Sequence, residues 1–175
     1  KGGRSEAFAR QGGRLFLVPA AGGEPRQLAA KIRDASFPVW SPDGRTILFV
    51  GANPGATRRE HTWFLTPAAE ARPVPTNAAA ILPPDNLPSP SQWLPSHQIV
   101  FAERRTDGAN LYRVGIDAAA AKVTGRPERL TFGGGLENAP SLAANGTVAL
   151  ADLTWNFDLW SLPIDTRSAR VNGEP

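Results

Sequence analysis

A pair of large apolar residues returns at a fixed interval along this chain. The copies lie 48 residues apart and are Leu15-Phe16, Trp63-Phe64, Leu111-Tyr112 and Leu159-Trp160. Each pair opens a short apolar segment, from LFLVP in the first copy to LWSLP in the last. A second element recurs between the pairs, as VWSPDGRTILFV, QWLPSHQIVFAE and SLAANGTVALAD. Repeats of this length are single supersecondary units that bury their apolar faces on their neighbours.

The first full unit carries the signals of short strands joined by tight turns. Ser41-Pro42-Asp43-Gly44 is typical of a β-turn, because Pro presets φ, Asp bonds to nearby backbone and Gly accepts positive φ. The β-branched and aromatic segments around this turn favour strands. We predict four antiparallel strands here, at Phe37–Trp40, Ile47–Val50, the segment from Trp63, and Val74–Thr76.

The later copies repeat this plan. The predicted strands of the second unit are Ser91–Leu94, Gln98–Glu103, Asn110–Ile116 and Glu128–Phe132. Those of the third are Ala139–Leu142, Thr147–Ala151 and Asp158–Ile164, and we expect its fourth strand to be missing. Near the start, we expect strands at Leu15 and at Arg26–Ala29 without the two that precede them in the other units.

A period of this length with four short strands per unit predicts an all-β fold, a β-propeller of four-stranded antiparallel blades. We expect a single domain over residues 1–175 with about three and a half blades, at 1–35 (partial), 36–77, 91–132 and 139–175 (partial). Closed propellers have roughly four to eight blades. The ring is therefore expected to be partial or open, to belong to a longer chain, or to close by self-association of propeller halves.

The repeated aromatic residues are expected to form the packing between blades. A blade that is covered on both faces has nearly continuous apolar runs rather than strict alternation, as seen here. We therefore expect burial of Phe16, Phe64, Tyr112 and Trp160, and of Trp40 and Trp93.

Two stretches resemble known repeats. FPVWSPDGRTILFV, from Phe37, is similar to the WD40-like repeat of TolB-type propellers. RPERLTFGGGLENAPSLAANGTVAL and NFDLWSLPID, from Arg126 onward, resemble repeats in the extracytoplasmic parts of bacterial membrane-anchored serine/threonine kinases and winged-helix regulators. The turn has changed to Leu94-Pro95-Ser96-His97 and Ala143-Ala144-Asn145-Gly146 in the later copies, and Asn-Gly still suits a hairpin. The resemblance covers nearly the whole chain and implies an architecture more specifically than a function.

Motifs of catalysis and metal binding are missing from the sequence. It has neither a Gly-x-Ser-x-Gly elbow nor the glycine-rich, catalytic and metal-binding motifs of a kinase. Cysteine is absent, and His61 and His97 belong to loops expected at opposite rims, so each is read as structural or solvated. We predict a chain that is not an enzyme and uses no cofactor or metal; any kinase domain of a parent protein would lie elsewhere.

Loops at one rim of a propeller are the candidate binding positions, because loops on a rigid scaffold commonly carry function. The loops before the innermost strands carry Lys31, Arg33, Asp34, Asp85, Asn86, Glu137 and Asn138. These residues either bind a ligand at the channel mouth or solvate it and cap turns. The proline-rich segment Leu82–Pro90 either reaches over the mouth, contacts a partner or is only a rigid, solvated loop.

Charge and hydropathy limit the partners. The net charge of +3 is scattered, and the pairs Arg58-Arg59 and Arg104-Arg105 are expected in exposed loops, which disfavours nucleic acid. No apolar run is long enough to span a bilayer, so a membrane would be reached only through parts outside this chain.

We predict a non-catalytic binding or sensor propeller of a bacterial envelope signalling protein. Its parent would be a receptor kinase or a transcriptional regulator, and its location extracytoplasmic (periplasmic). It would recognise a protein, a peptide or a small polar ligand at the rim. The alternatives are a TolB-like envelope assembly scaffold and the substrate-gating propeller of a prolyl-oligopeptidase-type hydrolase.

Overall fold

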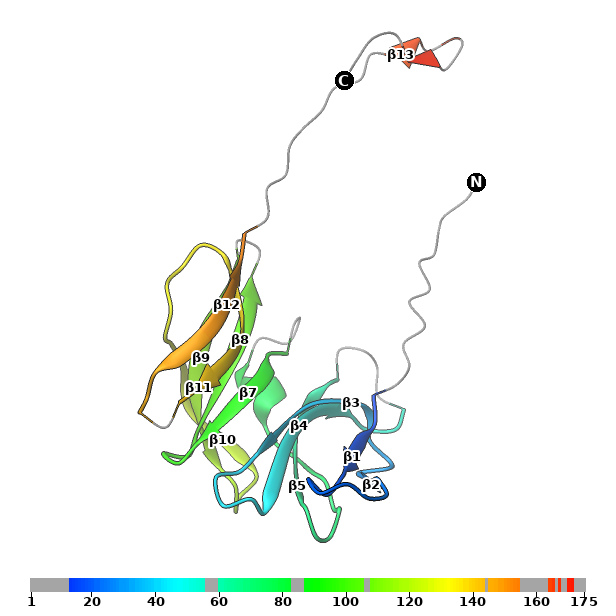
Figure 1. Cartoon of the computed structure of the whole chain (residues 1–175), viewed down its shortest axis with the longest axis vertical. Coiled ribbons are helices and arrows are strands. Elements are labelled where there is room, and N and C mark those ends of the chain that lie inside the picture. The colour runs from blue at the N-terminus through cyan, green and yellow to red at the C-terminus, as the bar shows by residue number, and fades with distance from the viewer. Residues whose placement is uncertain are drawn as a thin grey trace.

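The computed structural model describes residues 13–55, 60–82, 87–105, 108–143, 145–154, 164–165, 167 and 170–171. Within these ranges the fold is mostly β and built of antiparallel sheets, as predicted, with one short helix, α1 (Ala78–Ile81) (Figure 1). The strands of the N-terminal half are β1 (Leu15–Leu17), β2 (Arg26–Leu28), β3 (Arg33–Trp40), β4 (Thr46–Ala52), β5 (Thr62–Pro67) and β6 (Val74–Pro75). Those of the C-terminal half are β7 (Ser89–Leu94), β8 (Gln98–Arg105), β9 (Gly108–Asp117), β10 (Lys122–Arg129), β11 (Leu136–Leu142), β12 (Val148–Leu153), β13 (Ile164–Asp165) and β14 (Arg170–Val171).

The first sheet has the order β3-β4-β5-β6, which is the predicted four-stranded antiparallel unit. Its first turn is closed by side chains. The Ser41 hydroxyl donates to Asp43 Oδ1 at 2.6 Å, and the Arg45 N–H donates to the same oxygen at 3.1 Å. Gly44 takes φ 68°, the conformation for which glycine was expected. The turn therefore forms as its four residues predict.

The second sheet contains β7, β8, β9 and β10 in antiparallel succession, and β11 joins β9 in parallel at a single pair, Leu136 with Ala109. The predicted fourth strand, Glu128–Phe132, is wrong in its bounds. β10 begins at Lys122, because a tight turn at Asp117 returns the chain at once, and a bulge between Thr124 and Glu128 takes up the extra residues. Phe132 lies beyond β10 and is 78% exposed.

The 48-residue period extends to strand register. The pairs Leu17–Arg26 and Leu65–Val74 are one period apart, as are Ile116–Val123 and Ile164–Val171. The last pair joins β13 to β14, so the expectation that the final unit lacks a fourth strand is wrong: β14 pairs with β13 as β10 pairs with β9. Of the predicted strand Asp158–Ile164, all but Ile164 lies outside the described residues.

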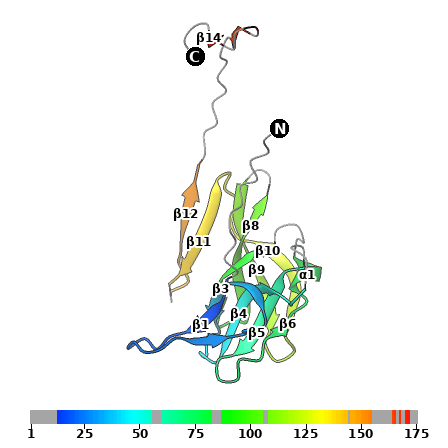
Figure 2. The same cartoon turned by 90° about the vertical axis from the view of Figure 1, so that its right-hand side faces the viewer.

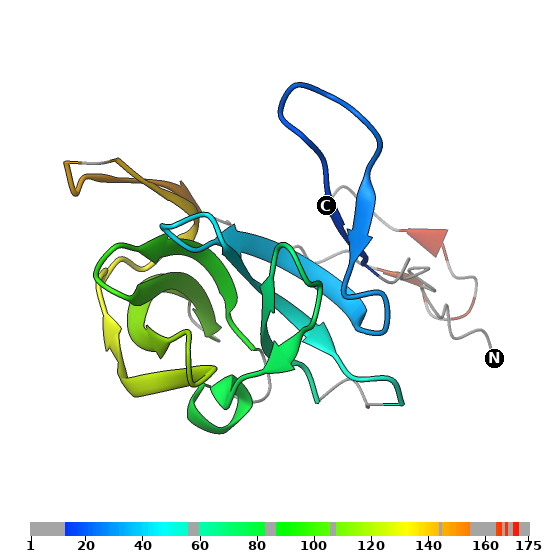
Figure 3. The same ribbon diagram turned by 90° about the horizontal axis from the view of Figure 1, so that it is seen from below.

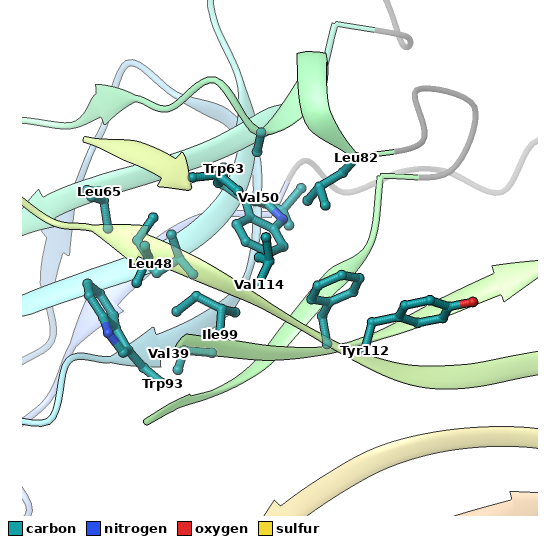
Figure 4. Packing of buried hydrophobic residues seen from close by; sticks show 14 residues of the cluster. Val39, Leu48, Val50, Trp63, Leu65, Leu82, Trp93, Ile99, Tyr112 and Val114 are labelled. Atoms are coloured by element: carbon teal, nitrogen blue, oxygen red, sulfur yellow. The ribbon is translucent and has the colours of Figure 1, made fainter. Parts of the chain in front are cut away.

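Both faces of the first sheet are covered, which explains its continuous apolar runs. On β4, Leu48 and Val50 belong to the core shared with the second sheet, and Ile47 and Phe49 belong to the core shared with the β1–β2 hairpin. Figure 3 shows β3 and β4 between that hairpin and the second sheet. The larger core is centred on Trp63, beside Val50 and Val114 (Figure 4). Helix α1 lies against β10 at the edge of this core (Figure 2).

The expected aromatic burial is correct in part. Phe64, Tyr112 and Trp93 are buried, whereas Trp40 is 47% and Phe16 46% exposed; Trp160 lies outside the described residues. The burial prediction is wrong for Trp40 because Val39, and not Trp40, takes the inward position on β3, opposite Leu48 of β4. On β7 the tryptophan itself takes the inward position, since Trp93 lies opposite Ile99 of β8. The burial prediction is wrong for Phe16 because Leu15 and Leu17 lie on the covered face of the β1–β2 hairpin, and alternation along the strand places Phe16 on the opposite face.

Strand β12 is exposed along its whole length. Its apolar residues Val148, Leu150 and Leu153 all reach the surface of the described structure. Among the described residues, no helix has the length and apolar character needed to cross a membrane.

Candidate ligand-binding cavity

A cavity of about 760 Å³ opens where β3, β7 and β11 approach one another. Each of these strands is the first of an antiparallel succession: β3-β4-β5-β6, β7-β8-β9-β10 and β11-β12. All three contribute wall residues, and β8 and β9 add Ala102, Arg104 and Ala109. The volume lies in the range of roughly 300 to 1,000 Å³ that holds small ligands in proteins.

A proline lies in the cavity wall on each of the three strands: Pro38 on β3, Pro90 on β7 and Pro140 on β11. Each sits at or beside a one-residue bulge, where the strand has one residue more than its partner. Proline has no N–H to donate and is tolerated in sheets at bulges and edges. Each of the three strands therefore lacks one main-chain donor at a residue of the cavity wall.

Phe37 and Ala139, which precede two of these prolines, have left-handed backbone conformations. Their φ angles are 53° and 48°. Positive φ is uncommon for residues other than glycine and is an outlier for bulky side chains, so it is expected only where the surrounding structure imposes it. On β3 this conformation presents a phenylalanine ring, 53% exposed, to the cavity; on β11 it presents only a methyl group.

Glu137 is a buried carboxylate in the cavity wall, 6% exposed. It accepts hydrogen bonds from the Thr131 hydroxyl and from Asn110 Nδ2, the latter at 3.4 Å. Asn110 in turn accepts from the Arg129 guanidinium at 2.5 Å. Because both of these hydrogen bonds are to Oε2, one oxygen of Glu137 is anchored in the fold while the residue borders the cavity.

Arg104 is the cation of the described wall. It lies on β8 opposite Ala109, is exposed, and has no hydrogen-bond or ion-pair partner among the described residues. The expectation that Arg104-Arg105 lies in a loop is wrong, because β8 extends through both residues. Arg58 and Arg59, which were expected in an exposed loop, lie outside the described residues.

The structure separates the predicted rim residues into three groups. Glu137 and Asn138 line the cavity. Lys31, Arg33 and Asp34 do not; Asp34 lies on β3, with its Oδ2 3.5 Å from Nε2 of His61 in the loop between β4 and β5. Asp85 and Asn86 lie outside the described residues. A binding role for any of the seven stays a prediction.

Two prominent wall residues, Phe37 and Arg104, were not predicted. The signal for Phe37 was its place before Pro38 in the segment that leads into the Ser-Pro-Asp-Gly turn. Arg104 could have been found by continuing the alternation of β8 from Ala102, since residues two apart share a face.

The fold is similar to that of a solved structure described as putative TolB from Agrobacterium tumefaciens. The TM-score is 0.59 at 19% sequence identity, over 91% of this chain and 55% of that one. A TolB structure from Acinetobacter baumannii matches with a TM-score of 0.49 at 16% identity, over 91% of this chain and 48% of that one. This chain thus spans about half the length of both. No family model matches it, and no curated protein matches it in sequence. At this level of identity, the likeness to the Agrobacterium structure shows a shared fold.

Proposed function

We propose that this chain is part of a WD40-like β-propeller that binds a peptide segment of another protein in the cavity between β3, β7 and β11. The propeller is supported by the 48-residue register, by the contacts of β3 with β7 and of β7 with β11, and by the fold shared with the Agrobacterium structure. In such a ring the first strand of each blade borders the central channel. The cavity would then be a section of that channel.

The observation that carries the proposal is the composition of the cavity wall. Most of its residues are apolar or small, and a few polar groups, Arg104, Glu137 and Asn138, converge on the same space. Ligand sites in proteins combine an apolar lining with few polar groups in this manner. A peptide fits this wall better than a small polar ligand, because a peptide can cover Phe37, Pro38 and Pro90 as well as engage the polar groups.

Binding is proposed in preference to catalysis. Ser89 and Ser91 line the cavity, but no histidine stands among the described wall residues to act as a base for either hydroxyl. We place the module in a bacterial envelope protein, outside the cytoplasm, as the sensor part of a receptor kinase or transcriptional regulator. An assembly scaffold like TolB is the second candidate, and the shared fold favours it over a hydrolase gate.

Filling the cavity tests this proposal. Ser91 is a half-buried wall residue at the β7 bulge, and Ser91→Trp would occupy space that a ligand needs. Ser96→Trp, in the exposed turn after β7, is the matched control. A fluorescent library of short apolar peptides should bind the unchanged chain and Ser96→Trp, and lose binding to Ser91→Trp, when measured by fluorescence polarisation. Equal binding to both variants would refute the cavity as the site.

A further inference from the structure

We infer that the ligand of this cavity carries a carboxylate, which Arg104 binds, next to an apolar group that packs on Phe37. The inference rests on the proposed function and names the chemical class of its ligand, an acidic peptide with apolar neighbours. It follows from three features of the wall: an exposed cation with no partner among the described residues, a half-exposed aromatic ring and a proline on each of three strands.

Arg104 supplies the charge. Its guanidinium offers a positively charged, planar fork of donors that matches a carboxylate in bidentate geometry. Arg104 has no partner among the described residues. Glu137, the other charged group of the described wall, is held by Asn110 and Thr131. Glu137 is buried whereas Arg104 is exposed, so the charged group that the described wall presents to a ligand is the Arg104 guanidinium, which is complementary to an anionic group.

Phe37 supplies the apolar contact. Its ring is 53% exposed although it borders a cavity, and its backbone is held at φ 53°. Ala139, which has the same backbone conformation on β11, offers no comparable surface. The three strands thus do not present equal surfaces, and apolar recognition is concentrated on the β3 side of the cavity.

The three prolines of the cavity wall favour recognition of a peptide through its side chains. An extended peptide commonly adds to an exposed strand edge through main-chain hydrogen bonds, which read no sequence. Pro38, Pro90 and Pro140 interrupt the donors of β3, β7 and β11 at the cavity wall. With one main-chain donor missing from each strand, side-chain contacts supply more of the affinity, and these distinguish one peptide from another.

Three peptide pools test the carboxylate. Each pool contains acetylated, amidated hexapeptides of Ala, Leu, Pro and Phe with one fixed residue, which is Glu, Gln or Lys. Because the ends are blocked, only the fixed residue carries charge. We expect the Glu pool to bind about tenfold more tightly than the Gln pool, as a charge-assisted hydrogen bond is worth roughly that factor.

Variants of Arg104 assign the preference to this residue. Arg104→Gln should remove the difference between the Glu and Gln pools, and Arg104→Glu should shift binding toward the Lys pool. Arg104→Lys keeps the charge without the fork and should retain a reduced preference for Glu. Arg126→Gln, an exposed arginine of β10 outside the cavity, is the control and should change nothing. Circular dichroism confirms that each variant is folded.

The outcomes separate this inference from the proposed function. If the Glu and Gln pools bind equally and Ser91→Trp abolishes both, the cavity binds peptides and the role of Arg104 is wrong. If the preference for Glu persists in Arg104→Gln, the carboxylate is bound elsewhere and the inference is overturned. If no pool binds the unchanged chain, both ideas fail. Phe37→Ala should weaken all pools alike, and an unchanged affinity would overturn the apolar half.

Discussion

The indole Nε1–H of Trp63 donates a hydrogen bond of 2.8 Å to the carbonyl oxygen of Pro88. Trp63 lies on β5 of the first sheet, and Pro88 directly precedes β7 of the second. The ring is fully buried and meets Phe101 edge-on, with 5.7 Å between ring centroids. This contact joins the two sheets beside the cavity, since Pro88 is itself a wall residue.

Removing the Trp63 Nε1–H donor should destabilise the fold. Trp63→Phe leaves the Pro88 carbonyl without its partner and creates a void, so we expect a loss of about 2 to 4 kcal/mol in the free energy of unfolding. Trp93→Phe is the matched control, because Trp93 Nε1 is buried and has no partner in the described part of the chain. Trp93→Phe creates a similar void but removes a donor that makes no hydrogen bond, so its loss should be smaller than that of Trp63→Phe by about 1 to 3 kcal/mol. Urea denaturation of both variants measures the difference, and equal losses would contradict the assigned role of the hydrogen bond.

Two tryptophans at corresponding points of the repeat should differ in their contribution. Trp93 is 4% exposed and Trp40 is 47% exposed. We expect Trp93→Ala to cost about 3 to 5 kcal/mol and Trp40→Ala about 1 to 2 kcal/mol, because the first leaves a cavity in the core and the second does not. Thermal unfolding of the two variants provides the measurement. A larger loss for Trp40→Ala would mean that its exposed face is covered in the folded protein.

Asn77, which directly precedes α1, is joined to β10 through its side-chain amide. Its Oδ1 accepts from the Val123 N–H at 2.7 Å, and its Nδ2 donates to the Val123 carbonyl at 3.3 Å. Asn77→Ala leaves both backbone groups of a buried residue unpaired, which should cost about 1 to 3 kcal/mol. Amide hydrogen exchange at Val123 should accelerate more than at Val114, which lies within the β8–β9 ladder. Unchanged exchange at Val123 would show that the Asn77 side chain contributes nothing.

Asp43 should titrate below its ordinary value. The hydrogen bond from the Ser41 hydroxyl, and then that from the Arg45 N–H, lowers the pKa of this carboxyl below 3.8. A carboxyl whose pKa is lower in the folded state stabilises the fold above its unfolded pKa, and this contribution is lost as pH falls through the folded pKa. NMR titration should show the low value in the unchanged chain and a rise in Ser41→Ala. Asp43→Asn should remove this part of the acid dependence of unfolding; a pKa at or above 3.8 would contradict the turn geometry.

The candidate site could be predicted only in part. Glu137 and Asn138 were found because they precede a recurring strand, and they do line the cavity. Lys31, Arg33 and Asp34 satisfied the same rule but lie outside the wall, since the part of β3 that borders the cavity begins only at Phe37. Position relative to a strand is a local property, whereas inclusion in the wall depends on how three separate strands approach one another.

The sequence by itself determined the strand order of the first sheet, the Ser-Pro-Asp-Gly turn and the 48-residue register, because these depend on local backbone preferences and on alternation along each strand. Only the tertiary structure decided which face of β3 points inward. The bulge at Phe37 and Pro38 places Val39 in the core, leaves Trp40 half exposed and turns the Phe37 ring to the cavity. A bulge inserts one residue and so reverses which side chains face the core beyond it. The position of the bulge depends on the partner strand as well as on the residues of β3. The cavity could therefore be recognised only from the tertiary structure, which brings β3, β7 and β11 together.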